Sequence, residues 1–422
     1  VMLILLSLNL RSVYSVMCVF ITIILCLISM VGFMGWMYFI TGKDIYSFTI
    51  LSTSMPIILL TIANSDGVHI VARFKREMRV HKNPKKSINN TLNKLRAPIF
   101  LTSLTTAIAF LSMVFSPIPH MLGYGVVIAF GVIWAWLLST TLLPSLIIVK
   151  KWDIKSKTFN QNSFIENQIK SLSQKIINRP KKILVFSFLV AAISFIGIWF
   201  IKVEVNVIKF FKEDTSIRES TDFIDNEMSG SMNLTIRAKG DFENMENILL
   251  LDALEKKISE IPNLSEIKKI ISYPYIVREA YKIEKESFGE FNDIVYPTTN
   301  EELEVLYTTI SSYNDSRISS IINEDQNTTI ISAQMQTVST QKASDISDLI
   351  NSEISQFKKD FNTDIEFETT GLLVFLKEFV SMVVQSALIS ISISIFIIFI
   401  VSFIFYKKFS WAILSIIPLL TA

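Results

Sequence analysis

Cysteine and histidine are scarce in this chain of 422 residues, and their placement excludes several kinds of site. The two cysteines, Cys18 and Cys26, lie in one apolar run, about 12 Å apart along a helix and beyond disulfide reach. The three histidines, His69, His81 and His120, stand in separate places without metal-ligand spacing. The sequence therefore predicts neither a disulfide nor a metal site.

Two motifs of catalytic and nucleotide-binding proteins are also missing. No Gly-x-x-x-x-Gly-Lys loop is present to cradle ATP phosphates, and no Gly-x-Ser-x-Gly turn presents a nucleophilic serine. The net charge is only +2, which gives no indication of nucleic acid as a partner. We expect no enzyme activity, no cofactor and no nucleic acid.

What the chain does have is long apolar runs, and half of its residues are hydrophobic. Six runs are long enough to cross a bilayer core of about 30 Å, which predicts a polytopic α-helical membrane protein. Shorter apolar stretches at both ends of the sequence look like interrupted helices, so we expect a fragment of a longer chain. The six runs are Val13–Ile40, Thr49–Ala72, Ala97–Pro117, Met121–Val149, Ile183–Ile201 and Phe379–Tyr406.

Positive charge is concentrated in alternate connections between these runs. Arg73–Arg96 and Lys150–Lys182 hold nine Lys or Arg residues each, whereas Thr41–Phe48 holds only Lys43. The positive-inside rule places the two basic segments in the cytoplasm and Lys202–Thr370 outside. We expect Arg73–Arg96 to be an amphipathic segment on anionic lipid, although a solvated topology determinant would explain its charge equally well.

The large polar segment shows a different pattern, in which apolar and polar residues alternate over short stretches. Two βαβ-like units around a helical insertion predict an α+β domain of the split βαβ type. The expected strands are Val203–Val207, Gly230–Ile236, Leu264–Ile271, Thr328–Val338 and Asp364–Thr370, and the expected helices are Ser216–Met228, Phe242–Ile261, Thr298–Tyr313 and Gln341–Lys358.

One carboxyl group lies within an apolar run. Asp66 costs about 2.5–3.5 kcal/mol at such a position, so it needs a partner, a water-filled cavity or a proton. His69 follows one turn later on nearly the same helix face, and Asn64 adds polarity nearby. We interpret Asp66, His69 and Asn64 as a proton relay, with a purely structural carboxylate and a histidine at the headgroup level as the alternatives.

Hydroxyl side chains on the next run offer further support for such a relay. Thr102, Thr105 and Thr106 could face Asp66 and carry water or protons. The favoured alternative is that they bond to their own backbone and let helices pack closely.

Proline and glycine residues predict local features of the helices. We expect Pro98 in the first turn of a helix, and Gly123 and Gly125 at close helix contacts.

Several short motifs follow one another at spacings seen in a known family. They are Asn64–Ile70 with Arg73–Glu77, Leu95–Ile99 with Thr102–Thr106, Leu122–Gly125, Glu219–Asp225 with Gly230–Met232, Gly371-Leu372, and Ile417–Leu420. In this order they resemble the RND superfamily of exporters, in its MMPL and Patched-like branch, whose membrane region is called sterol-sensing in eukaryotic relatives.

That resemblance implies twelve membrane helices in two repeats, each interrupted by an extracytoplasmic porter-like domain. An acidic residue on the fourth helix would carry protons, and the matching position is Asp66. Gly67 follows it where the family often has tyrosine. The implied domains are 1–149, membrane helices of the first repeat; 150–182, a cytoplasmic linker; 183–201, the first helix of the second repeat; 202–370, the periplasmic α+β domain; and 371–422, further helices of the second repeat.

The function implied by the resemblance is export of hydrophobic or lipid-like substrates across a bacterial inner membrane, driven by the proton-motive force. Its partners would be membrane lipids, the substrate and protons, and a homo-oligomer is left open. Two alternatives stay open as well. One is a sterol-sensing, receptor-like protein that binds lipid without pumping, and the other is a protein-translocation accessory related to RND exporters.

Overall fold

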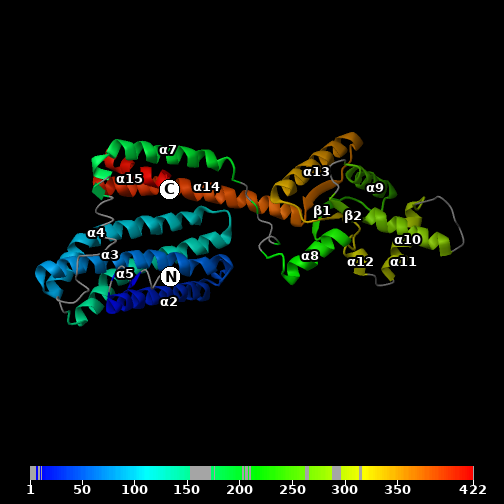
Figure 1. Cartoon of the computed structure of the whole chain (residues 1–422). Helices are drawn as coiled ribbons and strands as arrows, with labels where there is room; N and C mark the ends of the chain where they lie inside the picture. Colours follow the sequence, from blue (N-terminus) through cyan, green and yellow to red (C-terminus); the bar gives the residue numbers. More distant parts are fainter. Residues whose placement is uncertain are drawn as a thin grey trace. The chain divides into compact units, whose positions relative to one another are not determined.

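A computed structural model of the chain divides into two compact units, drawn in Figure 1. One unit comprises Val1–Ile201 and Met382–Ala422, and the other comprises Lys202–Ser381. The structure describes residues 6–7, 10, 12–152, 173–174, 176–201, 204, 208, 211–261, 266–287, 296–312 and 316–421.

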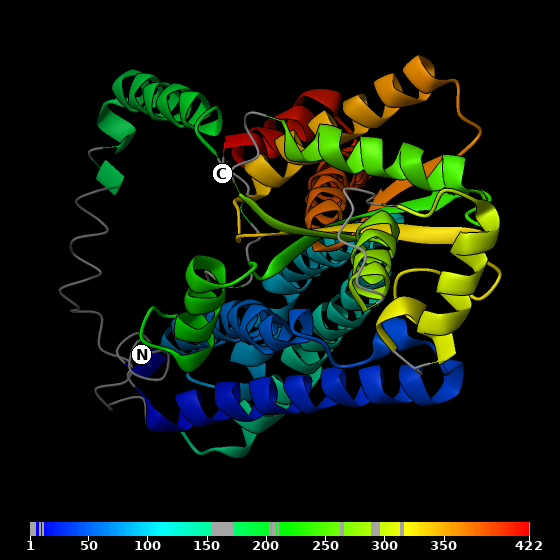
Figure 2. The ribbon, with the colours of Figure 1, turned by 90° about the vertical axis from the view of Figure 1, so that its right-hand side faces the viewer.

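The first unit is built from long apolar helices. Within the described residues six helices are long and apolar enough to span a membrane, which confirms the predicted polytopic membrane protein. The first of them, α2, can be followed along its whole length in blue in Figure 2. The spanning helices are α2 (Val13–Thr41), α3 (Met55–His81), α4 (Pro84–Leu111), α5 (Pro119–Val149), α7 (Pro180–Ile198) and α14 (Leu372–Tyr406). The unit also holds the shorter helix α15 (Phe409–Thr421) and the 3-10 turns η1 (Asp44–Tyr46), η2 (Leu51–Ser54) and η3 (Ser112–Phe115).

Local capping signals explain where α3 and α4 meet. Lys82 adopts a left-handed conformation after α3, and the Asn83 side chain accepts a hydrogen bond from the Lys86 backbone N–H at the start of α4. One prediction was therefore wrong: Pro98 lies inside α4, not in the first turn of a helix, because Asn83 and Pro84 already begin the helix. The basic segment forms the end of α3 and the first part of α4, and its position on anionic lipid stays a prediction.

Two glycines fit tight helix contacts, as predicted. A Cβ atom at Gly123 would lie 1.8 Å from the backbone oxygen of Ile45, and one at Gly125 would lie 2.3 Å from the backbone oxygen of Phe110. Any side chain at either position would collide with backbone, so α5 can approach η1 and the end of α4 only because both residues are glycine.

The second unit is an antiparallel sheet with helices. Its strands lie in the order β2-β3-β1-β4, and one helix connects β1 to β2 and another connects β3 to β4, which confirms the split βαβ prediction. The predicted strand Val203–Val207 lies mostly outside the described residues. The elements are β1 (Met232–Lys239), β2 (Ile267–Ser272), β3 (Thr328–Met335), β4 (Glu366–Thr370), α8 (Ser216–Glu227), α9 (Met245–Ser259), α10 (Tyr273–Ser287), α11 (Asn300–Ser312), α12 (Ser316–Ser319) and α13 (Thr340–Phe361).

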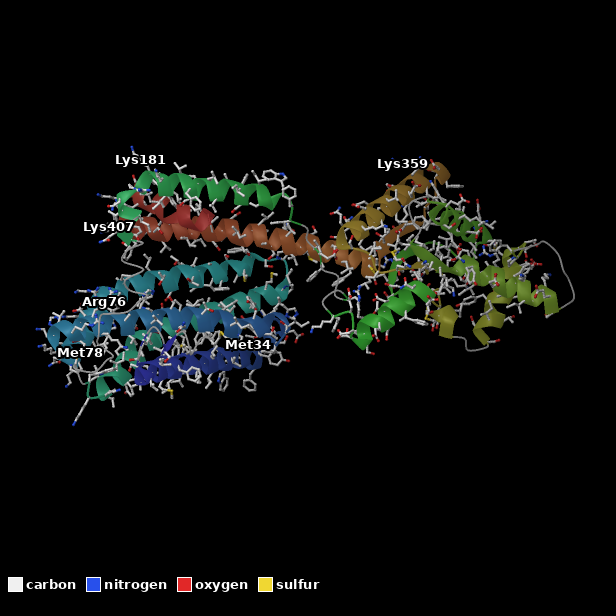
Figure 3. All side chains as sticks on the ribbon, viewed as in Figure 1. Met34, Arg76, Met78, Lys181, Lys359 and Lys407 are labelled. Atoms are coloured by element: carbon white, nitrogen blue, oxygen red, sulfur yellow. The ribbon has the colours of Figure 1, made fainter. Side chains whose placement is uncertain are left out.

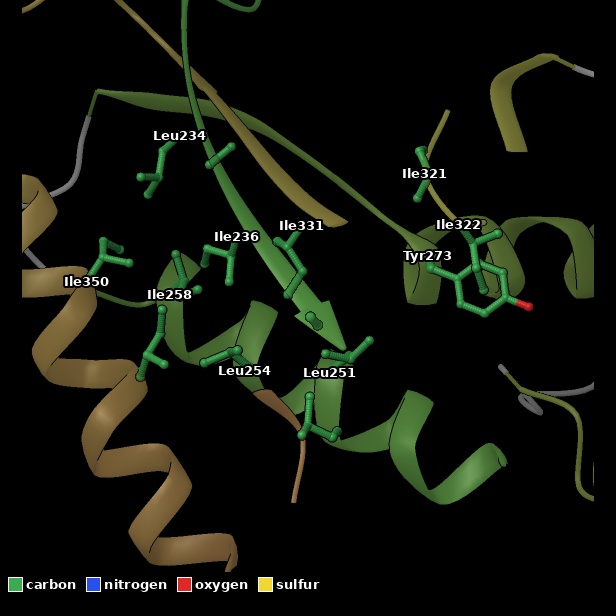
Figure 4. Close-up of a cluster of buried hydrophobic side chains, with 14 of the residues drawn as sticks. Leu234, Ile236, Leu251, Leu254, Ile258, Tyr273, Ile321, Ile322, Ile331 and Ile350 are labelled. Carbon is green, nitrogen blue, oxygen red and sulfur yellow. The ribbon is translucent and has the colours of Figure 1, made fainter. Parts of the chain in front are cut away.

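The core of this unit lies between the sheet and helices α9 and α13 (Figure 4). Alternation along β1 turns Leu234 and Ile236 to the helices, and the same alternation turns Ile331 of β3 to them. Burying each such side chain stabilises the fold by about 1.5–3 kcal/mol. The core side of the sheet meets α9 through Leu251, Leu254 and Ile258 and meets α13 through Ile350.

Candidate functional site

Asp66 lies on the buried face of α3, between Ala63 and Ile70, and only 6% of it is exposed. Its side chain has one hydrogen bond, in which the Ser103 hydroxyl of α4 donates to Oδ2 at 3.5 Å. This distance is at the long limit for a hydrogen bond. No cation pairs with Asp66 among the described residues, so this buried carboxyl group is almost without partners.

The structure does not bring the other predicted relay residues to Asp66. Three residues of helix rotate about 300°, so His69 points about 60° away from Asp66. His69 is exposed and makes no hydrogen bond or ion pair within the described parts of the chain. Asn64 has a buried side-chain oxygen, Oδ1, that lacks a hydrogen-bond donor there. The relay role of these two residues stays a prediction.

The three predicted threonines of α4 bond to their own helix. The hydroxyl of Thr102 donates to the Ile99 carbonyl at 2.8 Å, that of Thr105 to the Leu101 carbonyl at 3.0 Å, and that of Thr106 to the Thr102 carbonyl at 2.8 Å. None of them bonds to Asp66 among the described residues. The residue between them, Ser103, makes that contact, and only the rotation of α4 against α3 could have identified it.

A second buried carboxylate, Glu77, lies further along α3 and was not singled out from the sequence. Its Oε1 atom is 3.0 Å from Arg73 Nη2 and 3.0 Å from Lys94 Nζ, and its Oε2 atom is 3.5 Å from His81 Nε2. The side chain of Asn90 is 2.8 Å from the same histidine nitrogen. Glu77 therefore ties the ends of α3 and α4 together with a fixed negative charge.

Basic side chains gather at one end of the membrane unit. Figure 3 shows Arg76, Lys181 and Lys407 at that end, and Met34 towards the other. Arg76 lies near the end of α3, Lys181 at the start of α7, and Lys407 between α14 and α15. Their common location is the arrangement that the positive-inside rule requires of segments sharing one side of a bilayer.

In the α+β unit, Asp225 is held by hydrogen bonds. The backbone N–H and the hydroxyl of Ser231 donate to Oδ1 at 2.8 and 2.7 Å, and the Thr337 N–H donates to Oδ2 at 3.0 Å. Burial raises the pKa of Asp225, but these hydrogen bonds outweigh it and hold the pKa below its ordinary value. Asp225 is therefore a stable anion that fastens the turn at Gly230 to the end of β3.

A surface pocket of about 590 Å³ opens beside β1 and β4 of the same unit. Five carboxylates and a single lysine line it, together with neutral polar residues, and no apolar side chain contributes. An apolar substrate in this pocket would displace water from the carboxylates without offering them hydrogen bonds, which is unfavourable. No group of three acidic, histidine or cysteine residues suited to a metal ion occurs in the described part of the chain.

Comparison with known proteins gives a family for the membrane region. Residues 1–171 match the model of the MMPL family. A membrane protein of Methanocaldococcus jannaschii is 29% identical over 94 residues, which span 22% of this chain and 24% of that protein.

The fold has a counterpart among solved structures. The hedgehog release protein Disp of the water bear Hypsibius dujardini superposes with a TM-score of 0.62 at 11% identity, over 95% of this chain and 52% of Disp. The chain thus spans about half of that protein and shares its fold. Residues 1–171 thus resemble the MMPL family, and the chain as a whole shares its fold with Disp.

Proposed function

We propose that this chain is part of a secondary exporter, driven by the proton gradient, that moves a hydrophobic or lipid-like substrate out of the inner membrane of a bacterium. The observation that carries the proposal is Asp66, a carboxyl group buried in an apolar helix bundle with one long hydrogen bond. The match of residues 1–171 to the MMPL family supports it.

The chemistry follows from the cost of charge in a low-dielectric bundle. An unpaired carboxylate is unfavourable there, and uptake of a proton removes that cost. The free energy of Asp66 in the helix bundle therefore depends on whether its carboxyl group holds a proton. A charge that falls through 100 mV releases about 2.3 kcal/mol, which is enough to bias two arrangements of the helices.

Three neighbours complete the proposed site. Ser103 orients the carboxyl group through its hydrogen bond. Asn64, on another face of α3, offers a buried oxygen that could accept a hydrogen bond from water. His69 has an exposed side chain. It would exchange protons with groups elsewhere in the protein, and the family resemblance implies that such partners lie on the second repeat.

Replacing Asp66 with Asn in the whole protein tests the proposal. Reconstituted vesicles with an imposed pH gradient would be assayed for movement of a fluorescent phospholipid, and Ser65→Ala, at an exposed neighbour, is the matched control. We expect Asp66→Asn to lose transport while it still folds and inserts, and Ser65→Ala to keep it. Unchanged transport in Asp66→Asn would exclude the proton role, and a secretion defect instead would indicate a translocation accessory.

A further inference from the structure

Five serines form a polar contact between the 3-10 turn η3, which follows α4, and helix α14. We call this contact the serine seam: Ser112, Ser116, Ser386, Ser390 and Ser394. The Ser386 hydroxyl donates to the Ser116 hydroxyl oxygen at 2.6 Å. The Ser112 hydroxyl lies 2.8 Å from the Ser394 hydroxyl and donates to the Ser390 carbonyl at 3.0 Å. The three serines of α14 are four residues apart, so they share one face of the helix.

One member of the seam lacks a hydrogen bond for its side chain. Ser390 is only 8% exposed, and its Oγ atom has no partner among the described residues. A buried hydroxyl without a partner is unfavourable. Ser112 already contacts the backbone of Ser390 while its hydroxyl pairs with Ser394, one turn further along α14. Ser112 therefore pairs with one hydroxyl of α14, that of Ser394, while the hydroxyl one turn away, that of Ser390, is buried and unpaired in the described structure.

The two sides of the serine seam belong to parts of the chain that lead to Asp66 and to the α+β unit. Helix α4 carries Ser103, which bonds to Asp66, and Ser112 follows it nine residues later. Helix α14 begins at Leu372, with one residue between it and the end of β4 of the α+β unit, and continues unbroken to the seam. The seam thus joins the helix that contacts the buried carboxyl group to the helix that leaves the sheet.

We propose that the serine seam is a two-position contact, in which the Ser112 hydroxyl exchanges Ser394 for Ser390 when α14 shifts along α4. Ser390 and Ser394 are four residues apart, so the exchange corresponds to a step of about one helical turn, roughly 5–6 Å, which is a known kind of movement between two packed elements. The exchange would pass the proton state of Asp66 to the extracytoplasmic domain. It rests on the proposed function and assigns positioning roles to Ser112, Ser390 and Ser394.

Neutral hydroxyls suit such an exchange. A hydrogen bond between helices in a membrane is weak enough to be traded, whereas interlocked apolar side chains would have to repack. Each arrangement takes Ser112 away from one of the two hydroxyls of Ser390 and Ser394, and the Ser394 hydroxyl also lies 3.4 Å from the Ala109 carbonyl, which it could use when Ser112 leaves. A small bias from the carboxyl group can then select between them.

The first test uses two serines of α14 that differ in environment. Ser390 is buried without a side-chain partner in the described structure, whereas Ser392 is exposed, so Ser392→Ala is the matched control for Ser390→Ala. A seam with only a structural role predicts that Ser390→Ala is harmless, because its hydroxyl has no bond to lose in this arrangement. We expect transport of the fluorescent phospholipid to fall about fivefold to tenfold without a lower melting temperature, since the second arrangement loses its bond. Equal transport in the two variants would overturn the proposal.

The second test locks the seam. The Ser116 and Ser386 hydroxyls are close enough that the Ser116→Cys and Ser386→Cys pair should form a disulfide, and the native Cys18 and Cys26 are buried in α2. Oxidation should stop transport and reductant should restore it. Full transport by the oxidised pair would show that the seam does not move.

The rate of disulfide formation separates this proposal from the proposed function. We expect Asp66→Asn to change that rate severalfold, because it removes the group whose proton state biases the seam. If Asp66→Asn abolishes transport but leaves the rate unchanged and Ser390→Ala active, only the seam proposal fails. If Asp66→Asn transports normally, the proton role fails instead.

Discussion

Two carboxyl groups on one helix, Asp66 and Glu77, are equally buried and differently paired. Each is 6% exposed and each lies on the buried face of α3. Glu77 has Arg73, Lys94 and His81 around it, whereas Asp66 has a single serine at 3.5 Å among the described residues. Burial alone therefore does not distinguish a structural acid from one that can exchange a proton. The number of cationic partners does.

The largest effect expected from this comparison is on transport. Asp66→Asn should lower transport by roughly 100-fold or more, which is the size of the contribution that a proton-transferring group makes to a reaction. It should not lower the melting temperature, because the amide replaces a buried acid that has no cation beside it in the described structure. Vesicle transport and thermal unfolding of the same preparation check both parts. If Asp66→Asn lowered stability without lowering transport, Asp66 would have a structural role like that of Glu77.

Glu77→Gln should show the opposite pattern. It leaves the cations of Arg73 and Lys94 unpaired, but both are partly exposed and can reach water or lipid headgroups. We expect the free energy of unfolding to fall by about 1–3 kcal/mol and transport per folded molecule to change little. Lys94→Gln is the control, and its effect should be below about 1 kcal/mol because that side chain is more than half exposed.

The α+β unit supplies a third acid that sharpens the comparison. Asp225 resembles Glu77 in being fixed, although hydrogen-bond donors and not cations hold it. Its pKa is lowered on folding, so its stabilising contribution is complete above the unfolded value of about 3.9 and is lost as the pH falls through the folded value.

Asp225→Asn should therefore weaken the unit at pH 7 by about 1–3 kcal/mol and lose this effect in acid. Hydrogen exchange of the β1 amides, followed from pH 7 into the acid range, measures the change in the whole protein. Asp222→Asn is the matched control on α8, because its half-exposed carboxylate pairs only with Arg218 among the described residues. If Asp225→Asn weakened the unit equally at every pH, hydrogen bonds to the ionised carboxylate could not be what lowers the pKa of Asp225.

The same acids show how far the sequence could predict this molecule. The apolar runs, the strand alternation and the position of Asp66 are local patterns, and each could be predicted from neighbouring residues. Pro98 was misplaced because a stronger start, Asn83 with Pro84, lies upstream in the same helix. Arg73 and His81 lie four residues before and after Glu77, so helical spacing could have identified these two partners. The contacts of Asp66 with Ser103 and of Glu77 with Lys94 depend on how α3 rotates against α4, which no local pattern contains.

The smallest expected effect concerns the two kinds of hydroxyl on α4. Ser103 is the one hydrogen-bond partner of Asp66 in the described structure, whereas the hydroxyl of Thr106 bonds only to its own helix there. Ser103→Ala should lower transport by about threefold to tenfold, the equivalent of one hydrogen bond, because the carboxyl group loses its fixed orientation.

Thr106→Val, which keeps the shape of the side chain, should change transport by less than about twofold, since the lost bond is to a carbonyl that the helix already satisfies. Initial rates in the same vesicles give the comparison. Equal losses in the two variants would mean that the hydroxyls of α4 act together, as a polar path, and that Asp66 does not depend on Ser103 alone. A loss confined to Ser103→Ala would separate the hydroxyl that holds the carboxyl group from those that only hold the helix.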